Sequence, residues 1–368
     1  MNIPFIDFKK LHEPIKEETN AAIQNVIDSN AFIMGKAVSD FESDFAKAHD
    51  VKHCIAVSSG TDANHLVLWG LGIKAGDEVI IPANTFIATA WGATLCGATP
   101  VFVDCQPDSY NIDPEKIEAK ITPKTKAIVA VHLYGQPADL DELRKIADRH
   151  KIFLVEDAAQ SHIARYKDKP AGGLSSAASF SFYPGKNLGA FGEGGAVTTN
   201  DDELAKRLRM LRDHGSSKKY YHEYFGHNYR MEGIQGAVLG VKLKHLDVWT
   251  NSRRSAAEKY SELLKNIEQI SLPEEMTYAR HVYHLYVITT PERDHLQQFL
   301  TENGINSGLH YPVPLHLQKC FEHLGYKKGD FPVTEKLADE CLSLPMFPDL
   351  KDEQIEYISE KIKHFFKQ

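Results

Sequence analysis

The sequence predicts an α/β protein with a mostly parallel seven-stranded sheet in a large domain and a smaller α+β domain at its C-terminal end. Short runs rich in β-branched residues alternate with helical patterns through the first two-thirds of the chain, as in βαβ units. The chain of 368 residues also exceeds the length of one ordinary domain, which is roughly 150 residues. We therefore expect a large domain over 1–240 and a small one over 241–368.

The seven strands expected in the sheet are short apolar runs bounded by turn residues. They cover 54–57, 78–82, 99–103, 126–133, 151–156, 177–182 and 194–199. The helices expected between them cover 62–73, 85–97, 114–120 and 138–150. Because open α/β sheets bind ligands beyond the carboxyl ends of their strands, we expect the site residues to follow these runs.

The last third of the chain carries a different pattern. After a helix near 202–214, the polar and aromatic stretch 216–231 is too long for a tight turn and is a candidate functional loop. A long helix is expected over 232–264. The elements expected after it are a strand over 281–289, a helix over 292–303, a strand and loop over 305–318, and helices over 333–341 and 352–366.

Composition limits the classes of partner and compartment. The formal net charge is −8, which provides no basic surface for nucleic acid or anionic lipid, so we expect a small-molecule substrate. The five cysteines form no C-x-x-C pair, which favours a reducing cytoplasm over a disulfide framework. The first residues lack a basic region followed by an apolar run, so we expect no signal peptide there, and the uncharged run 79–103 contains prolines and glycines typical of a buried α/β core rather than a membrane span.

No metal site is expected from the sequence. The segment HEYFGH at 222–227 resembles H-E-x-x-H, but its second histidine comes five residues after the first. Two histidines at that spacing do not share a helix face, so they would not bind zinc together.

Lys186 stands in the most informative segment, SFSFYPGKNLGAFGEGGAVTT at 179–199. It follows Gly185 at the end of a strand. A phosphate-binding P-loop is excluded because Phe180 stands where that motif requires glycine. An ordinary solvated lysine would fit the turn, but a lysine among apolar neighbours also suits an amine of lowered pKa that forms Schiff bases.

Asp157 ends the apolar strand in KIFLVEDAAQSH, residues 151–162. Taken alone, such a carboxylate could cap a helix. Together with Lys186 it indicates a site for pyridoxal phosphate, whose ring nitrogen needs an acidic partner to stay protonated. In AVSSGTDANHLVL at 56–68, a strand passes through serine and glycine into a helix whose N-terminus could be an ordinary cap or could bind the cofactor phosphate.

Four motifs fall in order along the chain: SSGTDA at 58–63, EDAAQSH at 156–162, SFYPGKNLG at 181–189 and NYRMEGIQGA at 228–237. This set resembles the DegT/DnrJ/EryC1 family of pyridoxal phosphate-dependent sugar aminotransferases, and the resemblance runs over nearly the whole chain. It implies the fold-type I aminotransferase architecture and a homodimer with active sites at the subunit interface.

The resemblance also implies roles for residues around the cofactor ring. Lys186 would be the lysine that forms the Schiff base and moves the proton, and Asp157 would pair with the ring nitrogen. Gln160 would contact the ring oxygen. Phe86 would stack on the ring, although an aromatic residue at an apolar helix start could equally belong to the core.

Further residues carried over from the family concern the cofactor phosphate. Gly60, Thr61 and Ser181 would hold it within one subunit. Asn228 would reach the phosphate of the neighbouring subunit, which accounts for the polar loop around it.

The substrate implied is a nucleotide-linked ketosugar, with L-glutamate as donor and 2-oxoglutarate as its product. The sequence is most similar to the branch acting on dTDP-3-keto-6-deoxyhexoses, giving a dTDP-3-amino-3,6-dideoxyhexose. Candidate contacts to the sugar or diphosphate, each of which could instead be a hydrogen-bonded structural residue, are His162, Tyr183, Tyr229, His310 and Tyr311. Ile163 departs from the branch, where a small glycine is more usual.

Three alternatives stay open at this point. The protein could aminate C4 of the sugar, it could be a dehydratase of the same fold, or it could be a non-enzymatic regulator. The presence of Lys186 argues against the dehydratase, in which histidine replaces the lysine. The acidic charge and the lack of an appended DNA-binding segment give the regulator no distinguishing feature.

Overall fold

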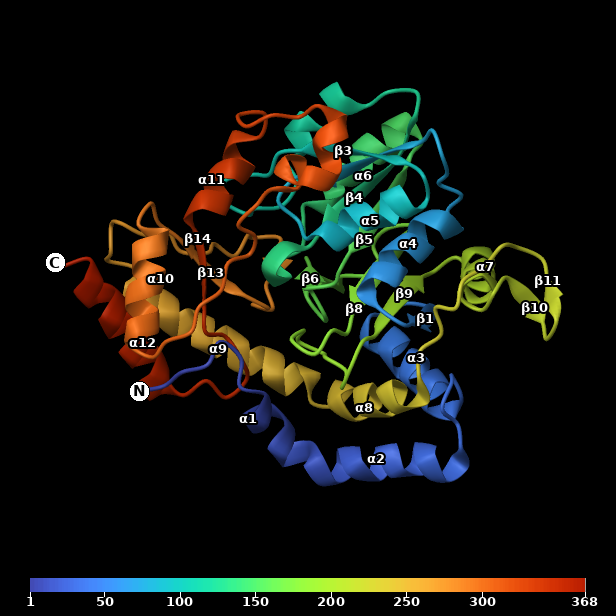
Figure 1. The fold of residues 1–368 in the computed structure, drawn as a ribbon, viewed down its shortest axis with the longest axis horizontal. Helices are drawn as coiled ribbons and strands as arrows, with labels where there is room; N and C mark the ends of the chain where they lie inside the picture. The colour runs from blue at the N-terminus through green and yellow to red at the C-terminus, as the bar shows by residue number, and fades with distance from the viewer. Residues whose placement is uncertain (368) are drawn as a thin grey trace.

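The computed structural model describes residues 1–367, and its larger part is built on one seven-stranded sheet (Figure 1). In spatial order the strands are β1 (His53–Val57), β9 (Gly195–Thr199), β8 (Ala177–Ser181), β5 (Phe153–Asp157), β4 (Thr125–Val131), β2 (Glu78–Pro82) and β3 (Thr99–Val103). Strand β9 alone runs opposite to the other six strands, so it pairs antiparallel with both β1 and β8. The expected mostly parallel sheet is confirmed.

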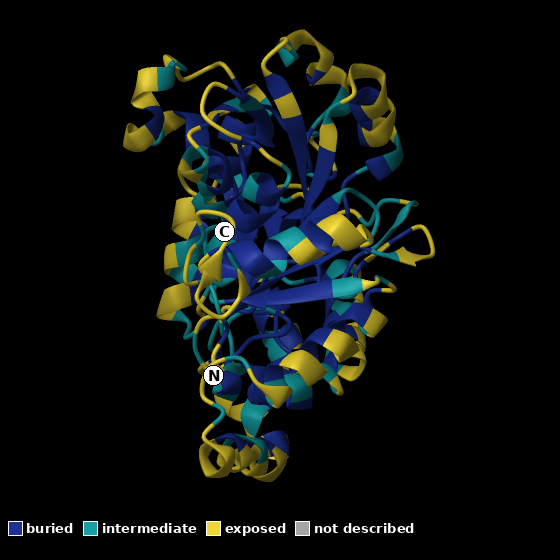
Figure 2. Cartoon of the chain, turned by 90° about the vertical axis from the view of Figure 1, so that its right-hand side faces the viewer, coloured by how far each residue is buried: buried dark blue, intermediate teal, exposed yellow. Residues whose placement is uncertain are grey.

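Helices cover both faces of this sheet. Their bounds are α4 (Gly60–Gly70), α5 (Ile87–Leu95), α6 (Leu140–His150) and α7 (Asp202–Arg212). Helices α4, α5 and α7 share one apolar core with Ile81, whereas α6 shares another with Ile80. Successive residues of a strand point to opposite faces, so each strand is buried on both sides and reads as a continuous apolar run. In Figure 2 the strands of this sheet are coloured mostly as buried.

Three helices lie before the first expected strand. They are α1 (Phe8–His12), α2 (Lys16–Ser29) and α3 (Lys36–Ala48). Helix α2 buries only Thr19 and Val26, so its sequence carries little helical periodicity. Helix α3 packs Val38, Phe41 and Phe45 into a core shared with β1, β8 and β9.

The long helix expected over 232–264 is two helices, α8 (Gly233–Leu243) and α9 (Leu246–Leu264). The break has a packing reason, because Leu239 contributes to the core beside α3 whereas Tyr260 and Leu264 contribute to a separate C-terminal core. The expected helix over 114–120 is likewise two 3₁₀ turns, Pro114–Lys116 and Glu118–Lys120. Further 3₁₀ turns cover Glu13–Ile15, Leu133–Gly135, Leu315–Leu317 and Lys319–Leu324.

The C-terminal part contains a two-stranded antiparallel sheet surrounded by helices. The elements are β13 (Tyr286–Thr289), α10 (Arg293–Glu302), α11 (Pro332–Glu340), β14 (Cys341–Leu344) and α12 (Asp352–Phe365). The expected strand over 281–289 begins only at Tyr286, because the backbone N–H groups of Val282 and Leu285 donate to the loop after β4. These two hydrogen bonds hold His284, which lies between the two donors, close to the larger sheet.

Two small sheets lie outside the main sheet, near the surface. One contains β6 (Arg165–Tyr166), β7 (Lys169–Pro170) and β12 (Ala279–Arg280), and the other is a hairpin of β10 (Ser216–Lys218) and β11 (Tyr221–His222). The hairpin projects from the body of the molecule beyond α7 (Figure 1). It lies within the stretch expected to be a functional loop.

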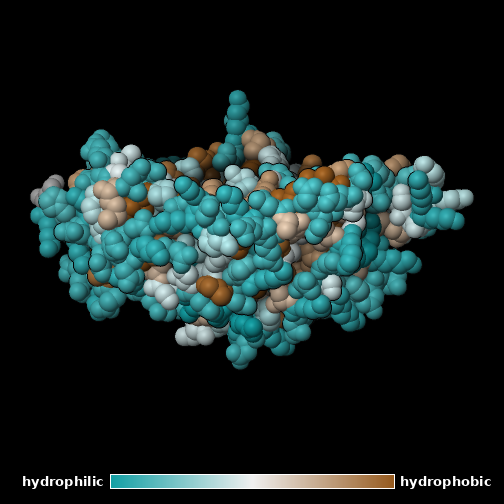
Figure 3. Space-filling view, turned by 90° about the horizontal axis from the view of Figure 1, so that it is seen from below, coloured by the Kyte–Doolittle hydropathy of each residue, from teal (hydrophilic) through white to brown (hydrophobic). Residues whose placement is uncertain are grey.

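The start of the chain packs against the C-terminal part. Ile3 is fully buried in the core of α9, α10 and α12, and its backbone bonds to Gly304 and Asn306. The boundary at 240/241 stays a prediction. Among residues 1–367, no helix has both the length and the apolar character needed to cross a bilayer. The underside of the molecule is largely hydrophilic, with small apolar areas between polar side chains (Figure 3).

Candidate active site

A cavity of about 520 Å³ lies at the carboxyl ends of β4, β5 and β8. This is the position where open α/β sheets bind ligands. The structure brings ten of the residues expected from the sequence to its wall: Gly60, Thr61, Phe86, Asp157, Gln160, Ser181, Tyr183, Lys186, His310 and Tyr311. Four separate stretches of sequence, around residues 60, 86, 157 and 186, therefore converge on one cavity with residues from the C-terminal part.

Lys186 ends a tight turn after β8. The backbone N–H of Lys186 closes this turn by donating to the Tyr183 carbonyl at 2.8 Å. Burial lowers the pKa of Lys186 from 10.5 to about 8, and the nearby negative charge of Asp157 opposes that shift. No hydrogen bond or ion pair engages its ammonium within residues 1–367. The side chain is thus a partly deprotonated amine facing the cavity, as required of a nucleophile toward an aldehyde.

Asp157 is the last residue of β5, and its buried carboxylate is held by three donors. Asn64 Nδ2 and Thr89 Oγ1 donate to Oδ2 at 3.1 and 2.7 Å, and the backbone N–H of Ala159 donates to Oδ1 at 3.1 Å. A carboxylate fixed in this way presents negative charge at a defined place in the cavity. The alternative that Asp157 is only a helix cap is wrong, because β5 is followed by a turn.

The N-terminus of α4 forms another part of the wall. Ser59 caps this helix by accepting from the Asp62 N–H at 3.1 Å. A Cβ added at Gly60 would lie 2.5 Å from the Cβ of Ser181, so only glycine lets β8 approach the helix start this closely. The first turn leaves backbone N–H groups without intrahelical partners, beside hydroxyls, in an arrangement that suits a phosphate.

The aromatic wall is formed by Phe86 and Tyr311, whose ring centroids lie 5.4 Å apart. Phe86 is 51% exposed at the start of α5, so the alternative that it belongs to the core is wrong. Gln160 accepts from the Tyr134 N–H at 2.7 Å and donates to the Tyr311 hydroxyl at 3.0 Å. These bonds fix the amide of Gln160 at the cavity.

Two further predicted residues, Tyr183 and His310, also line the cavity. Tyr183 is exposed. The Nδ1 atom of His310 lies 2.8 Å from the Ser343 hydroxyl. Burial and the positive charge of Lys186 lower the pKa of His310 to about 4, so its imidazole is neutral at pH 7.

His162 does not reach the cavity, which corrects the expectation of a substrate contact. Its side chain is fully buried, and its ring packs against Phe45, Phe180 and Phe182. Burial lowers its pKa well below 6.5. No local pattern around His162 indicates this burial, because Phe45 comes from α3, which was not among the expected elements.

Asn228 and Tyr229 also lie outside this cavity. Asn228 is exposed, and its backbone pairs with that of Asp213 in an isolated antiparallel β-bridge. The hydroxyl of Tyr229 lies 3.0 Å from His65 Nδ1, and its carbonyl accepts from the Ser58 N–H. A contact of Tyr229 with a substrate in the same cavity is therefore contradicted, since its side chain packs behind α4.

Several cavity residues were missed by the sequence analysis: Phe5, Ile6, Asn64, Thr85, Thr89, Glu193 and His284. Helical spacing could have found two of them, because Asn64 comes four residues after Gly60 and Thr89 three residues after Phe86. Phe5, Ile6 and His284 come from distant parts of the chain, and no local pattern marks them.

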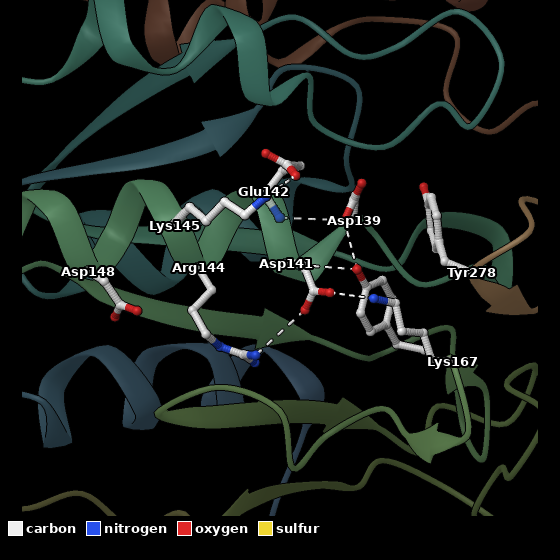
Figure 4. Close-up of a pocket in the computed structure, with 9 residues that line it drawn as sticks. Asp139, Asp141, Glu142, Arg144, Lys145, Asp148, Lys167 and Tyr278 are labelled. Atoms are coloured by element: carbon white, nitrogen blue, oxygen red, sulfur yellow. Dashed lines mark hydrogen bonds and ion pairs between the residues drawn. The ribbon is translucent and has the colours of Figure 1, made fainter.

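A second hollow, beside α6, has the wrong chemistry for an active site (Figure 4). Its charged side chains already pair with each other: Asp141 with Arg144 and Lys167, and Glu142 with Lys145. A ligand would have to break these surface pairs. In the described part of the chain, no group of three or more histidine, cysteine, aspartate or glutamate residues is placed to hold a metal ion.

Comparison with known proteins identifies the family. The model of the DegT/DnrJ/EryC1/StrS aminotransferase family matches residues 13–363. A protein of Geobacillus stearothermophilus named pleiotropic regulatory protein is 48% identical over 100% of this chain and 99% of its own. The dTDP-3-amino-3,4,6-trideoxy-alpha-D-glucose transaminase of Streptomyces venezuelae is 45% identical over 99% of this chain and 96% of its own.

Solved structures agree with these relatives. The crystal structure of S. venezuelae DesV in complex with a ketimine intermediate has a TM-score of 0.98 at 44% identity, covering 100% of this chain and 99% of that one. The crystal structure of NtdA from Bacillus subtilis with bound cofactor PMP has a TM-score of 0.92 at 32% identity, covering 100% and 86%. The expected fold, enzyme class and pyridoxal phosphate cofactor are confirmed, and the chain belongs to the DegT/DnrJ/EryC1/StrS aminotransferase family.

Proposed function

We propose that this protein transfers the amino group of L-glutamate to the keto carbon of a nucleotide-linked keto-6-deoxyhexose, with 2-oxoglutarate as the second product. The substrate that we favour is a dTDP-3-keto-6-deoxyhexose, giving a dTDP-3-amino-3,6-dideoxyhexose. The observation that carries the proposal is the single cavity that holds the amine of Lys186, the carboxylate of Asp157 and the N-terminus of α4. The name of the S. venezuelae transaminase supports the dTDP-sugar.

The residues of the cavity fit pyridoxal phosphate, which when bound supplies an electron sink for negative charge at the amino carbon. Lys186 would hold the cofactor through its amine, and Asp157 would keep the ring nitrogen protonated. Gln160 would contact the ring oxygen, and Phe86 would cover one ring face.

The phosphate of the cofactor would lie at the N-terminus of α4. Gly60 and Thr61 would donate backbone N–H groups there, and Ser181 would donate its hydroxyl. The positive end of the helix dipole would favour the doubly charged phosphate.

Lys186 would also be the general base and acid of the reaction. Its Nζ would take the α-proton of glutamate and later return a proton to the sugar carbon that receives the amine. A pKa of about 8 suits both directions of transfer near neutral pH. Proton transfer by a positioned group typically contributes roughly 10²–10⁴ in rate.

Substrate contacts are assigned to three further residues of the cavity wall. Tyr183, His310 and Tyr311 would contact the sugar or the diphosphate. His310 is neutral, so it would donate or accept a hydrogen bond there without adding charge.

We also propose a homodimer with shared active sites. The segment 214–228 exposes aromatic side chains, of which Tyr220 is 81% and Phe225 95% accessible, and such residues usually mark an interface. In the dimer, Asn228 would reach the cofactor phosphate of the partner.

The free thiols of all five cysteines fit a reducing cytoplasm.

Shared sites can be tested by mixing two variants. Each proposed site takes Lys186 from one chain and Asn228 from the other. A dimer of one Lys186→Ala chain and one Asn228→Ala chain therefore contains one site with both substitutions and one intact site. If the chains reassort at random, mixing restores activity at about one quarter of the sites. No gain on mixing, or a monomer in sedimentation, would contradict the dimer.

The proposed reaction is tested by incubating the enzyme with glutamate and a panel of nucleotide 3-keto- and 4-keto-6-deoxyhexoses. We expect a new amino group at C3, located by NMR of the product, and formation of 2-oxoglutarate. Lys186→Ala should give neither product, whereas the exposed control Lys145→Ala should match the wild type. Amination at C4 alone would move the substrate to the other branch, and loss of a hydroxyl without amination would indicate a dehydratase.

A regulator is the second candidate, because the G. stearothermophilus relative carries that name. The same assay separates the two functions. A protein that binds no pyridoxal phosphate and forms no 2-oxoglutarate with any sugar of the panel would favour regulation over catalysis.

A further inference from the structure

The two oxygens of the Asp157 carboxylate have different surroundings. Oδ2 accepts two side-chain hydrogen bonds, from Asn64 Nδ2 at 3.1 Å and Thr89 Oγ1 at 2.7 Å. Oδ1 accepts one bond, from the backbone N–H of Ala159 at 3.1 Å. Oδ2 therefore has no room for a further donor in the carboxylate plane, whereas Oδ1 keeps one acceptor position.

The direction of these bonds is fixed by groups further from the cavity. The Ser179 hydroxyl donates to Asn64 Oδ1 at 2.7 Å, so the Asn64 amide must turn its NH₂ toward Asp157. The Thr89 hydroxyl proton goes to the carboxylate, so the Thr85 hydroxyl, 2.9 Å away, acts as donor to Thr89. The result is a chain of donors that ends at Oδ2.

All members of this network are buried. Asn64, Thr85, Thr89 and Ser179 are each no more than 5% exposed. Hydrogen bonds to an ionised acceptor are strong in such surroundings, and a member left unpaired is costly. The residues come from α4, the start of α5 and β8, which meet beside the end of β5 (Figure 1).

We propose that Asn64 and Thr89 are positioning residues that saturate Oδ2 of Asp157 and so leave Oδ1 as the single acceptor for the protonated ring nitrogen of the cofactor. This inference rests on the proposed function, since it assigns the acceptor atom within the same site. Neither residue needs to touch a reacting atom. Their effect is to stop the carboxylate from rotating and to keep its charge aimed at one place.

The proposal is tested with Thr89→Val, which replaces the hydroxyl by a methyl group of similar shape. The full-length, cofactor-free protein is titrated with pyridoxal phosphate and with its analogue in which a carbon replaces the ring nitrogen. Thr89→Val should bind pyridoxal phosphate at least about ten-fold more weakly than the wild type, because a carboxylate free to rotate would lose most of its charged hydrogen bond to the ring nitrogen. Its affinity for the analogue should be unchanged, because the analogue offers no N–H to Asp157.

Two further variants separate positioning from general damage. Thr89→Ser keeps the hydroxyl and should restore the affinity for pyridoxal phosphate. Thr94→Val makes the same substitution on the same helix, where the hydroxyl donates only to the Trp91 carbonyl, and should leave both affinities at the wild-type level. Asn64→Ala should repeat the selective loss seen with Thr89→Val.

Each other outcome has a defined meaning. Equal weakening of both ligands by Thr89→Val, or no weakening of either, would overturn the proposal while leaving the proposed function intact. Wild-type protein that binds the two ligands equally well would show that Asp157 does not recognise the ring nitrogen. No binding of pyridoxal phosphate by the wild type would overturn the proposed function together with this inference.

Discussion

The Lys186 amine should titrate far below an ordinary lysine. Burial lowers its pKa from 10.5 to about 8. At pH 7.5, roughly a quarter of Lys186 would then carry a free amine, against roughly one in a thousand for a lysine of ordinary pKa. Lys186 should therefore be the most reactive accessible lysine of the cofactor-free protein near neutral pH.

The assay is competitive acetylation with a trace of acetic anhydride over a range of pH, followed by mass spectrometry of the peptides. The labelling midpoint of Lys186 should lie at about pH 8. Lys145 is the internal reference, because its bond to Glu142 raises its pKa above 10.5. Lys242 also has a pKa lowered to about 8, but its side chain is fully buried and should stay unlabelled in the folded protein.

The substitution Asp157→Asn tests the direction in which the Asp157 charge shifts the pKa of Lys186. The negative charge of Asp157 raises the pKa of Lys186, so removing it should move the labelling midpoint below the wild-type value. A wild-type midpoint near pH 10.5, or an upward shift in Asp157→Asn, would refute the account of how the site lowers this pKa.

The remaining predictions concern the lysine, the phosphate site and acid stability. Lys186→Ala should abolish transamination while changing the denaturant midpoint little, since its ammonium makes no hydrogen bond within residues 1–367; a large loss of stability would contradict this. Gly60→Ala should weaken binding of pyridoxal phosphate, measured by fluorescence quenching, because the added Cβ would lie 2.5 Å from Ser181 Cβ. Burial lowers the pKa of His49 to about 4, so its contribution to stability is present above pH 6.5 and is lost as pH falls toward 4. Urea unfolding should show a loss on the order of 2 kcal/mol from this group between pH 7 and pH 5, and His49→Gln should flatten that dependence.

Much of the site could be predicted because parallel strands end at one edge of a sheet. The apolar runs that form β5 and β8 placed Asp157 and Lys186 correctly at that edge, and the strand-to-helix passage at 56–68 placed the N-terminus of α4 beside them. Local sequence is sufficient for such residues, since burial on both faces makes a strand visible as a continuous apolar run.

The failures share a different cause, which is packing between distant segments. His162 was expected at the substrate, but α3 covers it with Phe45 from more than a hundred residues away. The break between α8 and α9 lies where the chain passes between two cores, since Leu246 still packs in the core of α8 whereas Tyr260 packs in the C-terminal core. Asn64 and Thr89 become meaningful only when both point at Asp157, and that convergence is a property of the folded sheet.

The central claim is that Lys186 is the residue that binds pyridoxal phosphate. The most direct test is to incubate the protein with pyridoxal phosphate, reduce the complex with borohydride and locate the attached group by peptide mass spectrometry. The account predicts one labelled site, at Lys186, and loss of that label when glutamate is added before reduction. Labelling of another lysine in its place, or a label at Lys186 that glutamate does not remove, would contradict it.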